Sequence, residues 1–171
     1  MAFSVPQLSL KGRALRLLSG REHSRLELER RLIPHEESPG ELAAILDDLQ
    51  AKGFISEQRV VESVVHRKGP KLGTALIKRE LSGRGLSAEA VTEAVAGLQT
   101  TELARAREVW RKKFGKKFGA SADGEAAEQA PTPAERHQQM RFLAARGFGG
   151  ETIRRVLATA GNGQGTDDDD G

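Results

Sequence analysis

The hexapeptide LQAKGF at residues 49–54 recurs as LSGRGL at residues 81–86 and as LAARGF at residues 143–148. Each copy places a leucine, a basic residue, a glycine and an apolar residue in the same order. Glycine readily adopts the left-handed backbone conformation that ends many helices, and the leucine and the residue after glycine then meet as the apolar pair of a Schellman cap. The basic residue before each glycine is expected to face the negative end of its helix. We therefore predict that helices end at Gly53, Gly85 and Gly147, after Lys52, Arg84 and Arg146.

The composition indicates an aliphatic core. The chain has 171 residues, of which 37% are apolar, but aromatic residues account for only 4% and tyrosine is absent. This length suffices for one or two domains with cores of leucine, valine and alanine. The net charge of +3 is a small difference between 27 basic and 24 acidic residues. A nucleic acid or an acidic protein is therefore an allowed partner, but the charge does not require one.

Composition and motifs also narrow the cellular context and the chemistry. Without cysteine the chain has no disulfide, no thiolate metal site and no cysteine nucleophile, which favours a reducing compartment and predicts a cytoplasmic protein. The first residues, MAFSVP, do not resemble a signal peptide, and no stretch approaches the roughly 18 apolar residues of a membrane span. Motifs of phosphate-binding loops, zinc proteases and serine hydrolases are absent. We expect no enzyme activity, no cofactor, no metal and no membrane partner.

Apolar periodicity and capping patterns predict nine helices in three groups. The first group has helices over residues 10–20, from the capping box at 24–27 and from a second box at 38–41. The second group has helices from Ser56, over 74–83 and over 87–98. The third group has helices from Thr101 to Gly115, from the box at 132–135 and after Gly147.

These groups predict an all-α fold of three tandem three-helix repeats, each similar to a helix-turn-helix unit. The repeats are expected at residues 1–55, 56–99 and 100–160, with a mobile loop at 119–131 and a disordered acidic tail at 161–171. Groups of this size barely hold a core alone, so neighbours are expected to pack into an elongated, curved array. The outer surface of such an array, rather than a pocket, is the expected working part of a binding protein.

An ordered set of short motifs carries a family resemblance. The set begins with ALRLL at 14–18, REHS at 21–24 and ELERRL at 27–32, and it ends with RFLAARGF at 141–148. In this order the motifs resemble the RecX family, regulators of the bacterial RecA recombinase, over about residues 10–160. Two positions depart from the family pattern: Thr74 follows Gly73 in place of a proline, and Val60-Val61 replaces an aromatic–alanine pair. Neither departure is expected to change the fold.

The resemblance implies a monomeric, non-catalytic protein that binds RecA, mainly as the filament on single-stranded DNA. Such a protein would inhibit the recombinase, ATPase and co-protease activities of RecA, in DNA repair, homologous recombination and the SOS response. The family mode implies a long surface that lies along the helical groove of the filament. Direct, weak contact with DNA is a further expectation.

Two basic stretches are the candidate partner-binding or DNA-binding sites. The first stretch interleaves basic residues with Trp110, Phe114 and Phe118, whose spacing is typical of core residues, so its lysines and arginines are either a solvated face or a contact surface. Its basic residues are Arg105, Arg107, Arg111, Lys112, Lys113, Lys116 and Lys117. The second stretch, which extends in sequence to Arg84, contains Arg67, Lys68, Lys71, Lys78 and Arg79.

Other polar and apolar residues receive structural interpretations. The arginines of residues 21–31 alternate with glutamates, so pairing within the helix explains most of them. The histidines lack metal-ligand spacing and are expected to be surface or satisfied polar residues; they are His23, His35, His66 and His137. Met140 and Trp110 are expected to fill the core.

Two alternatives to RecA regulation remain open from the sequence. The first is a free-standing nucleic-acid-binding protein, because three-helix units resemble helix-turn-helix modules and the basic stretches can contact phosphates. The second is a scaffold for another protein complex.

Overall fold

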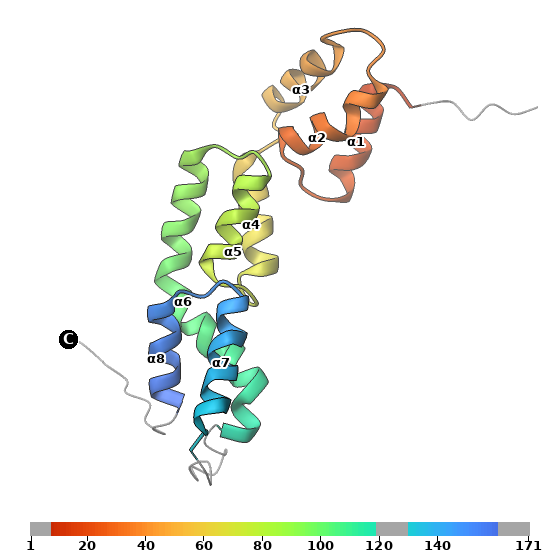
Figure 1. Cartoon of the computed structure of the whole chain (residues 1–171). Coiled ribbons are helices and arrows are strands. Elements are labelled where there is room, and N and C mark those ends of the chain that lie inside the picture. The colour runs from red at the N-terminus through yellow and green to blue at the C-terminus, as the bar shows by residue number, and fades with distance from the viewer. Residues whose placement is uncertain (1–7, 119–129, 161–171) are drawn as a thin grey trace, which may run out of the picture. The chain divides into compact units, whose positions relative to one another are not determined.

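The computed structural model describes residues 8–118 and 130–160, and within these ranges every regular element is helical (Figure 1). The predicted all-α fold is confirmed for this part of the chain. No helix in these ranges is long and apolar enough to cross a membrane. The predicted tail, and the predicted mobile loop except for residues 130 and 131, lie outside the described residues. The elements are α1 Leu10–Gly20, α2 Arg25–Leu32, the 3₁₀ helix η1 Ile33–His35, α3 Glu41–Ala51, α4 Glu57–Lys68, α5 Thr74–Gly83, α6 Ala88–Phe118, α7 Pro133–Ala145 and α8 Gly150–Ala160.

The chain forms two compact units. The first unit comprises Met1–Val64 and Glu80–Thr92, and the second comprises Val65–Arg79 and Glu93–Gly171. The division therefore runs through α4, α5 and α6, which contain the three helices predicted for the second group. The repeat limits predicted at residues 55, 99 and 160 stay a sequence prediction.

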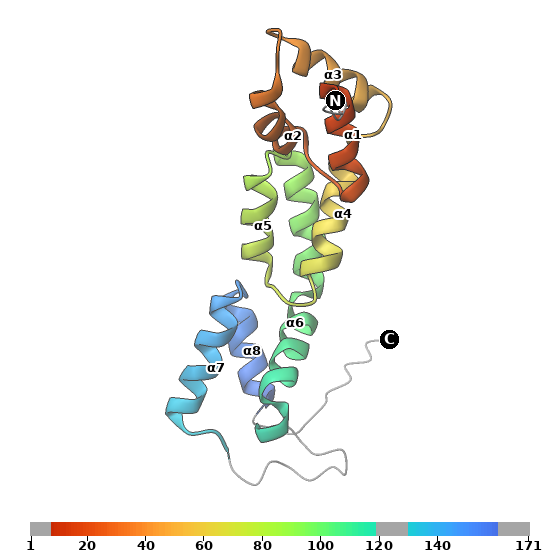
Figure 2. The same cartoon turned by 90° about the vertical axis from the view of Figure 1, so that its right-hand side faces the viewer.

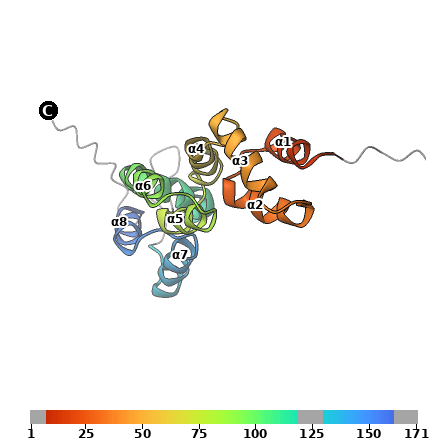
Figure 3. The same cartoon turned by 90° about the horizontal axis from the view of Figure 1, so that it is seen from above.

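In the first unit, α1, α2 and α3 pack against one another (Figure 3). Leucines form most of their core, and Leu28, Leu46 and Leu49 have no exposed surface. The capping box at the start of α2 is present as predicted, because the Ser24 hydroxyl accepts from the Glu27 amide and the Glu27 carboxylate accepts from the Ser24 amide.

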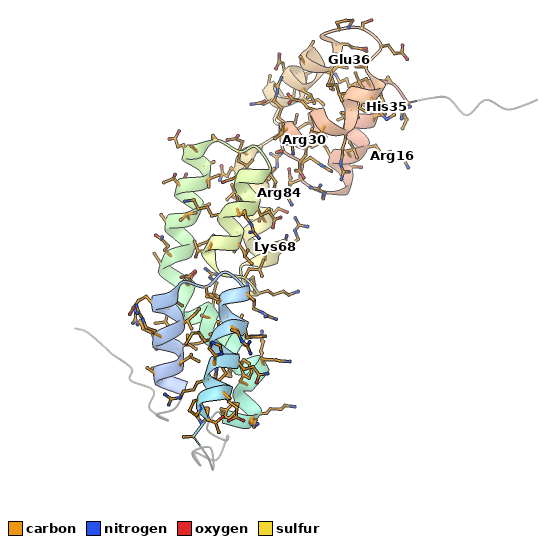
Figure 4. All side chains as sticks on the ribbon, viewed as in Figure 1. Arg16, Arg30, His35, Glu36, Lys68 and Arg84 are labelled. Atoms are coloured by element: carbon orange, nitrogen blue, oxygen red, sulfur yellow. The ribbon has the colours of Figure 1, made fainter. Side chains whose placement is uncertain are left out.

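The capping box predicted at residues 38–41 is wrong. The helix α3 begins at Glu41 after Gly40, which has φ +86° and makes no side-chain capping bond. Glu36 caps the helix instead, since its Oε1 accepts from the Leu42 amide at 3.0 Å. The turn between η1 and α3 brings this more distant carboxylate to the free amide of the first turn, where negative charge is favourable (Figure 4).

In the second unit, the C-terminal part of α6 forms a bundle with α7 and α8 (Figure 2). Trp110, Phe114 and Phe148 are among its buried residues. The predicted burial of Trp110 is confirmed, but the predicted burial of Met140 is wrong, because its side chain is 44% exposed. The preceding residue, Gln139, is buried in its place and accepts a 2.9 Å hydrogen bond from the Trp110 indole. A buried indole N–H needs such an acceptor, and this need explains a polar residue in the core.

The two helices predicted over residues 87–98 and 101–115 are one continuous helix, α6. The prediction of nine helices is therefore wrong at this point. The proposed break contained no proline, and the hydroxyls of Thr100 and Thr101 donate back to the carbonyls of Gly97 and Leu98 within the helix. A single glycine lowers helix propensity by only about 1 kcal/mol, which the tertiary packing of a long helix offsets.

The three predicted glycine caps are confirmed. Gly53, Gly85 and Gly147 have φ angles of +75°, +71° and +82°. In the first and third caps the amide after glycine donates to the leucine carbonyl, at 2.8 Å for Phe54 and 3.3 Å for Phe148. The caps differ in their apolar pairs, because Phe148 is buried whereas Phe54 is 49% exposed.

The basic residues before the glycines do not all face helix ends as predicted. Only Arg146 donates to a carbonyl of its own last turn, that of Phe142 at 3.3 Å. Lys52 pairs with Asp48 at 2.7 Å, and Arg84 pairs with two glutamates. Neighbouring carboxylates therefore attract these charged groups more strongly than the partial charge of a helix end does.

Two of the capping glycines also pack against a leucine of an earlier helix. A Cβ atom at Gly85 would lie 2.4 Å from Leu26 of α2, and one at Gly147 would lie 2.6 Å from Leu76 of α5. Backbone bonds accompany the second contact, since the amides of Gly73 and Ala75 donate to the carbonyls of Arg146 and Gly147. The same junction thus occurs once in each unit. At Gly53 the corresponding space is open.

Candidate partner-binding surface

The positive charge of the protein is concentrated in its second unit. Within its bounds in the sequence this unit carries seventeen basic and twelve acidic residues, seven of the acidic ones outside the described ranges, whereas the first unit carries ten basic and twelve acidic ones. All twelve basic residues predicted as candidate sites belong to the second unit. The net charge of the whole sequence hides this difference. The second unit is therefore the part of the molecule suited to a negatively charged partner.

The largest exposed basic group lies on the C-terminal half of α6, and we call it the α6 basic segment. Its members are Arg107, Arg111, Lys112, Lys113, Lys116 and Lys117, and all six are exposed. The side chains of Arg111, Lys112 and Lys117 are 73%, 68% and 69% exposed. Because an α-helix advances about 100° per residue, these side chains point in several directions around the helix axis rather than along one stripe. Pairs one turn apart, such as Lys112 and Lys116, share a side.

Two glutamates reduce the charge of this segment. Glu108 lies 2.7 Å from Arg111 and 3.3 Å from Lys112, and hydrogen bonds from these two residues lower its pKa. Glu135 at the start of α7 lies 2.7 Å from Lys117. The Lys117 contact and the hydrogen bonds from Thr132 lower the pKa of Glu135 to about 2. Arg107, Lys113 and Lys116 have no hydrogen-bond or ion-pair partner in the described part of the chain.

Arg105, the first basic residue predicted in this stretch, makes hydrogen bonds within the protein. Its guanidinium donates to the carbonyls of Gly69, Leu72 and Leu98 and to the hydroxyls of Thr74 and Thr101. Because these bonds use its donors, Arg105 holds the turn between α4 and α5 against α6. The structure separates it from the exposed basic residues that follow it in the sequence.

Glu102 supports the same turn. Its Oε1 accepts from the Thr74 amide at 2.8 Å, and its Oε2 accepts from the Thr152 hydroxyl at 3.0 Å. Burial acts to raise the pKa of Glu102, but hydrogen bonds from Thr74 and Thr152 and the charge of Arg105 outweigh it, so the pKa is lowered. A proline at position 74, as in the family pattern, would have no amide hydrogen to donate. The threonine at this position therefore allows the hydrogen bond to Glu102.

The second predicted stretch surrounds the turn between α4 and α5. Arg67, Lys71, Lys78 and Arg79 are exposed, and Lys68 at the end of α4 is partly buried (Figure 4). Arg67 and Lys68 each interact with other groups of the protein. Arg84, which extended this stretch in the sequence, lies in the first unit and bridges Glu27 at 3.1 Å and Glu80 at 2.9 Å. Its guanidinium is therefore used in an internal ion-pair network.

Sequence comparisons place the chain among known proteins. Residues 100–157 match the family model described as the third three-helix domain of RecX. Regulatory protein RecX of Leptothrix cholodnii is 50% identical over 161 residues, which cover 94% of both chains. Regulatory protein RecX of Ralstonia nicotianae is 44% identical over 160 residues, which cover 94% of this chain and 93% of the relative. The chain belongs to the RecX family. Its relatives are named regulatory proteins, and a RecX regulatory role follows for this chain.

Solved RecX structures share the fold. The crystal structure of RecX from Lactobacillus salivarius aligns with a TM-score of 0.69 at 18% identity, over 88% of this chain and 94% of that one. A second crystal structure, of regulatory protein RecX, aligns with a TM-score of 0.66 at 16% identity, over 87% of this chain and 71% of that one. The all-helical RecX architecture is thus retained at low sequence identity.

Several exposed basic residues of this RecX protein were not among the predicted sites. Arg136 and Arg141 lie on α7, and Arg154 and Arg155 lie on α8, all in the second unit. Arg154 pairs with Glu151, whereas the other three have no ion-pair partner in the described ranges. Sequence reasoning missed them because they stand singly or as one adjacent pair and form no dense basic run. The available signal for their exposure was their position between the periodic apolar residues of each helix.

This arrangement of exposed basic residues suits the binding of a negatively charged partner. Exposed guanidinium and ammonium groups can bind phosphates or carboxylates on a partner. Trp110 and Phe114 are in the core and so are not available to stack on bases. The described residues contain no group of three or more side chains suited to hold a metal ion.

Proposed function

We propose that this RecX protein binds the RecA recombinase, mainly as its filament on single-stranded DNA, and inhibits strand exchange, ATP hydrolysis and co-protease activity. Membership of the RecX family supports the class of partner. The observation that carries the proposed mode of binding is the concentration of exposed basic residues in the second unit. A filament of protein and DNA offers phosphates and acidic side chains to such a surface.

The proposed contact uses the α6 basic segment first. Lys113 and Lys116 have no ion-pair partner among the described residues, and Lys112 shares Glu108 with Arg111. These side chains can therefore turn to a partner without breaking a strong internal bond, because exposed ion pairs contribute little to stability. The turn between α4 and α5 adds further basic residues to the same unit. The predicted order of three repeats and a monomeric state belong to this proposal.

A binding experiment with charge-neutralised variants tests this mode. RecA filaments are assembled on single-stranded DNA with a slowly hydrolysed ATP analogue, and binding of the full-length protein is measured by interferometry. The K112Q/K113Q/K116Q variant is expected to bind about tenfold or more weakly, because each lost charge-assisted contact is worth about 1 kcal/mol or more.

The matched control removes three exposed basic residues from the first unit. The K11Q/R30Q/K52Q variant has the same change in net charge and should bind like the wild type, with less than a twofold difference. Equal weakening of both variants would show that overall charge, not the second unit, determines binding. Failure of the wild type to bind the filament would reject the proposal itself.

A free-standing nucleic-acid-binding activity is the second candidate, and the charge of the second unit favours it. In that case the protein alone should bind single-stranded oligonucleotides tightly, with an affinity that falls steeply as salt rises. Neutralising Arg111, Lys112 and Lys116 should then reduce the slope of log affinity against log salt by about 2, given about 0.7 per phosphate contact on single strands. Weak binding without RecA would favour the first proposal.

A further inference from the structure

The first unit contains an open pocket. Every polar side chain that lines it belongs to an arginine or a histidine. The pocket has a volume of about 540 Å³ and lies between α1, α2 and η1. Four arginines and two histidines line it, and no acidic residue does: Arg13, Arg16, Arg21, Arg31, His23 and His35. This clustering occurs in a unit whose described residues carry more acidic than basic side chains overall.

Three of these basic side chains are available for a ligand. The side chains of Arg16, Arg31 and His35 are exposed and make no hydrogen bond or ion pair with the described part of the chain. In Figure 4, Arg16 and His35 lie on the same outer side of this helical group. The other two arginines are held in place. Arg13 donates to the Leu8 carbonyl at 3.1 Å, and Arg21 donates to the Glu22 carbonyl at 2.8 Å and to Glu27 at 3.0 Å.

Apolar side chains and one buried histidine also line the pocket. Leu8, Leu17 and Leu32 contribute apolar surface. His23 also lines the pocket, is only 2% exposed, and its Nδ1 has no hydrogen-bond partner in the described protein. A buried polar nitrogen without a partner is costly unless a bound group satisfies it. The sequence interpretation of His23 as a surface or satisfied residue is therefore wrong.

We propose that this pocket binds a phosphate ester of nucleotide size, either a free nucleotide or one nucleotide of a single strand. Guanidiniums from α1 and α2 approach the space from two elements, which suits the several oxygens of a tetrahedral phosphate better than one planar carboxylate. The three leucines of the lining provide an apolar surface for the sugar and base. This site is separate from the basic residues of the second unit and does not rest on the proposed binding to RecA.

The experiment follows the histidine ring resonances of the full-length protein by NMR during titration with four ligands. The ligands are inorganic phosphate, thymidine 5′-monophosphate, a tetrathymidylate and a hexaglutamate peptide. His23 and His35 lie in the pocket, whereas His66 and His137 lie in the second unit and report binding there. Saturable shifts of His23 and His35 with thymidine monophosphate assign a free nucleotide. Shifts only with the tetranucleotide assign a nucleotide within a strand.

Neighbouring arginines of α2 provide a matched pair of variants. Arg30 and Arg31 are both exposed, but only Arg31 lines the pocket. R31Q should weaken the pocket titration about tenfold, as expected for one charge-assisted contact, and R30Q less than twofold. R16Q, on the other helix, should match R31Q.

Three results would overturn the assignment. These are unmoved His23 and His35 resonances with every phosphate ligand, equal losses in R30Q and R31Q, or saturation by hexaglutamate at the affinity of the nucleotide. If the wild-type protein shows these shifts but does not bind RecA filaments, the proposed function is rejected and the assignment of the pocket is retained.

Discussion

At the scale of single residues, the same glycine cap has different energetic roles at different places. Gly53 and Gly147 have nearly the same backbone conformation, but only Gly147 lies against another helix. The sequence motif predicts the conformation of both glycines. It does not predict the packing at Gly147, because the motif contains no information about Leu76, which lies more than sixty residues earlier.

Alanine substitutions separate the two roles. G53A should lower the free energy of unfolding by about 1–2 kcal/mol, the cost of a left-handed conformation for a residue with a Cβ. G147A should lower it by about 3 kcal/mol or more, since its Cβ would lie 2.6 Å from the Leu76 side chain and 2.8 Å from the Leu76 amide. Urea unfolding followed by circular dichroism measures both. Equal losses would show that the junction tolerates the added methyl group.

Arg105 and Arg107 form a second comparison on one helix. Substituting glutamine for Arg105 leaves three carbonyls without its guanidinium, so R105Q should lower the free energy of unfolding by about 2–4 kcal/mol. R107Q removes the same charge from an exposed side chain and should change stability by less than about 0.5 kcal/mol. Thermal and urea unfolding check this difference. A stable R105Q protein would contradict the structural role given to Arg105.

At the scale of elements, local sequence determined most helix starts and ends but not the continuity of α6. The capping boxes at Ser24 and Thr132 and the glycine caps depend on residues within one turn, and they formed as predicted. The start of α3 depends on Glu36, five residues earlier, and the continuity of α6 depends on packing along its whole length. Such dependence on distant groups explains why local patterns failed there.

The continuity of α6 predicts different responses to proline at two positions. T100P should lower the free energy of unfolding by about 3 kcal/mol or more, because it removes an interior helix bond and clashes with the preceding turn. A88P places proline at the first helical position, after Ser87, where no interior bond is lost, and it should be tolerated. Urea unfolding compares the two variants. Tolerance of T100P would restore the two-helix interpretation.

The start of α7 should depend on pH through Glu135. The pKa of Glu135 is lowered to about 2 in the folded protein, from an ordinary value of 4.5. A lowered folded pKa gives stability that is present above the unfolded value and is lost as pH falls through the folded value. The carboxyl carbon of Glu135 should therefore titrate near pH 2 in an NMR experiment, with fraying of α7 over the same range. A midpoint near 4.5 would contradict the capping and Lys117 contacts.

At the scale of the whole molecule, the sequence predicted the fold class and the family, but not where the charge lies. A net charge of +3 indicated a mildly basic protein, whereas the described residues place the excess of basic groups in the second unit. Helix periodicity indicated that Trp110 and Phe114 are core residues and treated the lysines and arginines between them alike. It could not show that Arg105 is bound to the α4–α5 turn, or that the basic pocket of the first unit exists, because both depend on residues brought together only by folding.

The central claim is that this RecX protein regulates RecA by binding through the exposed basic residues of its second unit. The most direct measurement is the steady-state ATP turnover of RecA on single-stranded DNA, with increasing amounts of the full-length protein. Turnover should fall at or below one protein per RecA protomer, and K112Q/K113Q/K116Q should require about tenfold more protein for the same inhibition. Unchanged turnover with the wild type, or identical inhibition by the variant, would contradict the claim.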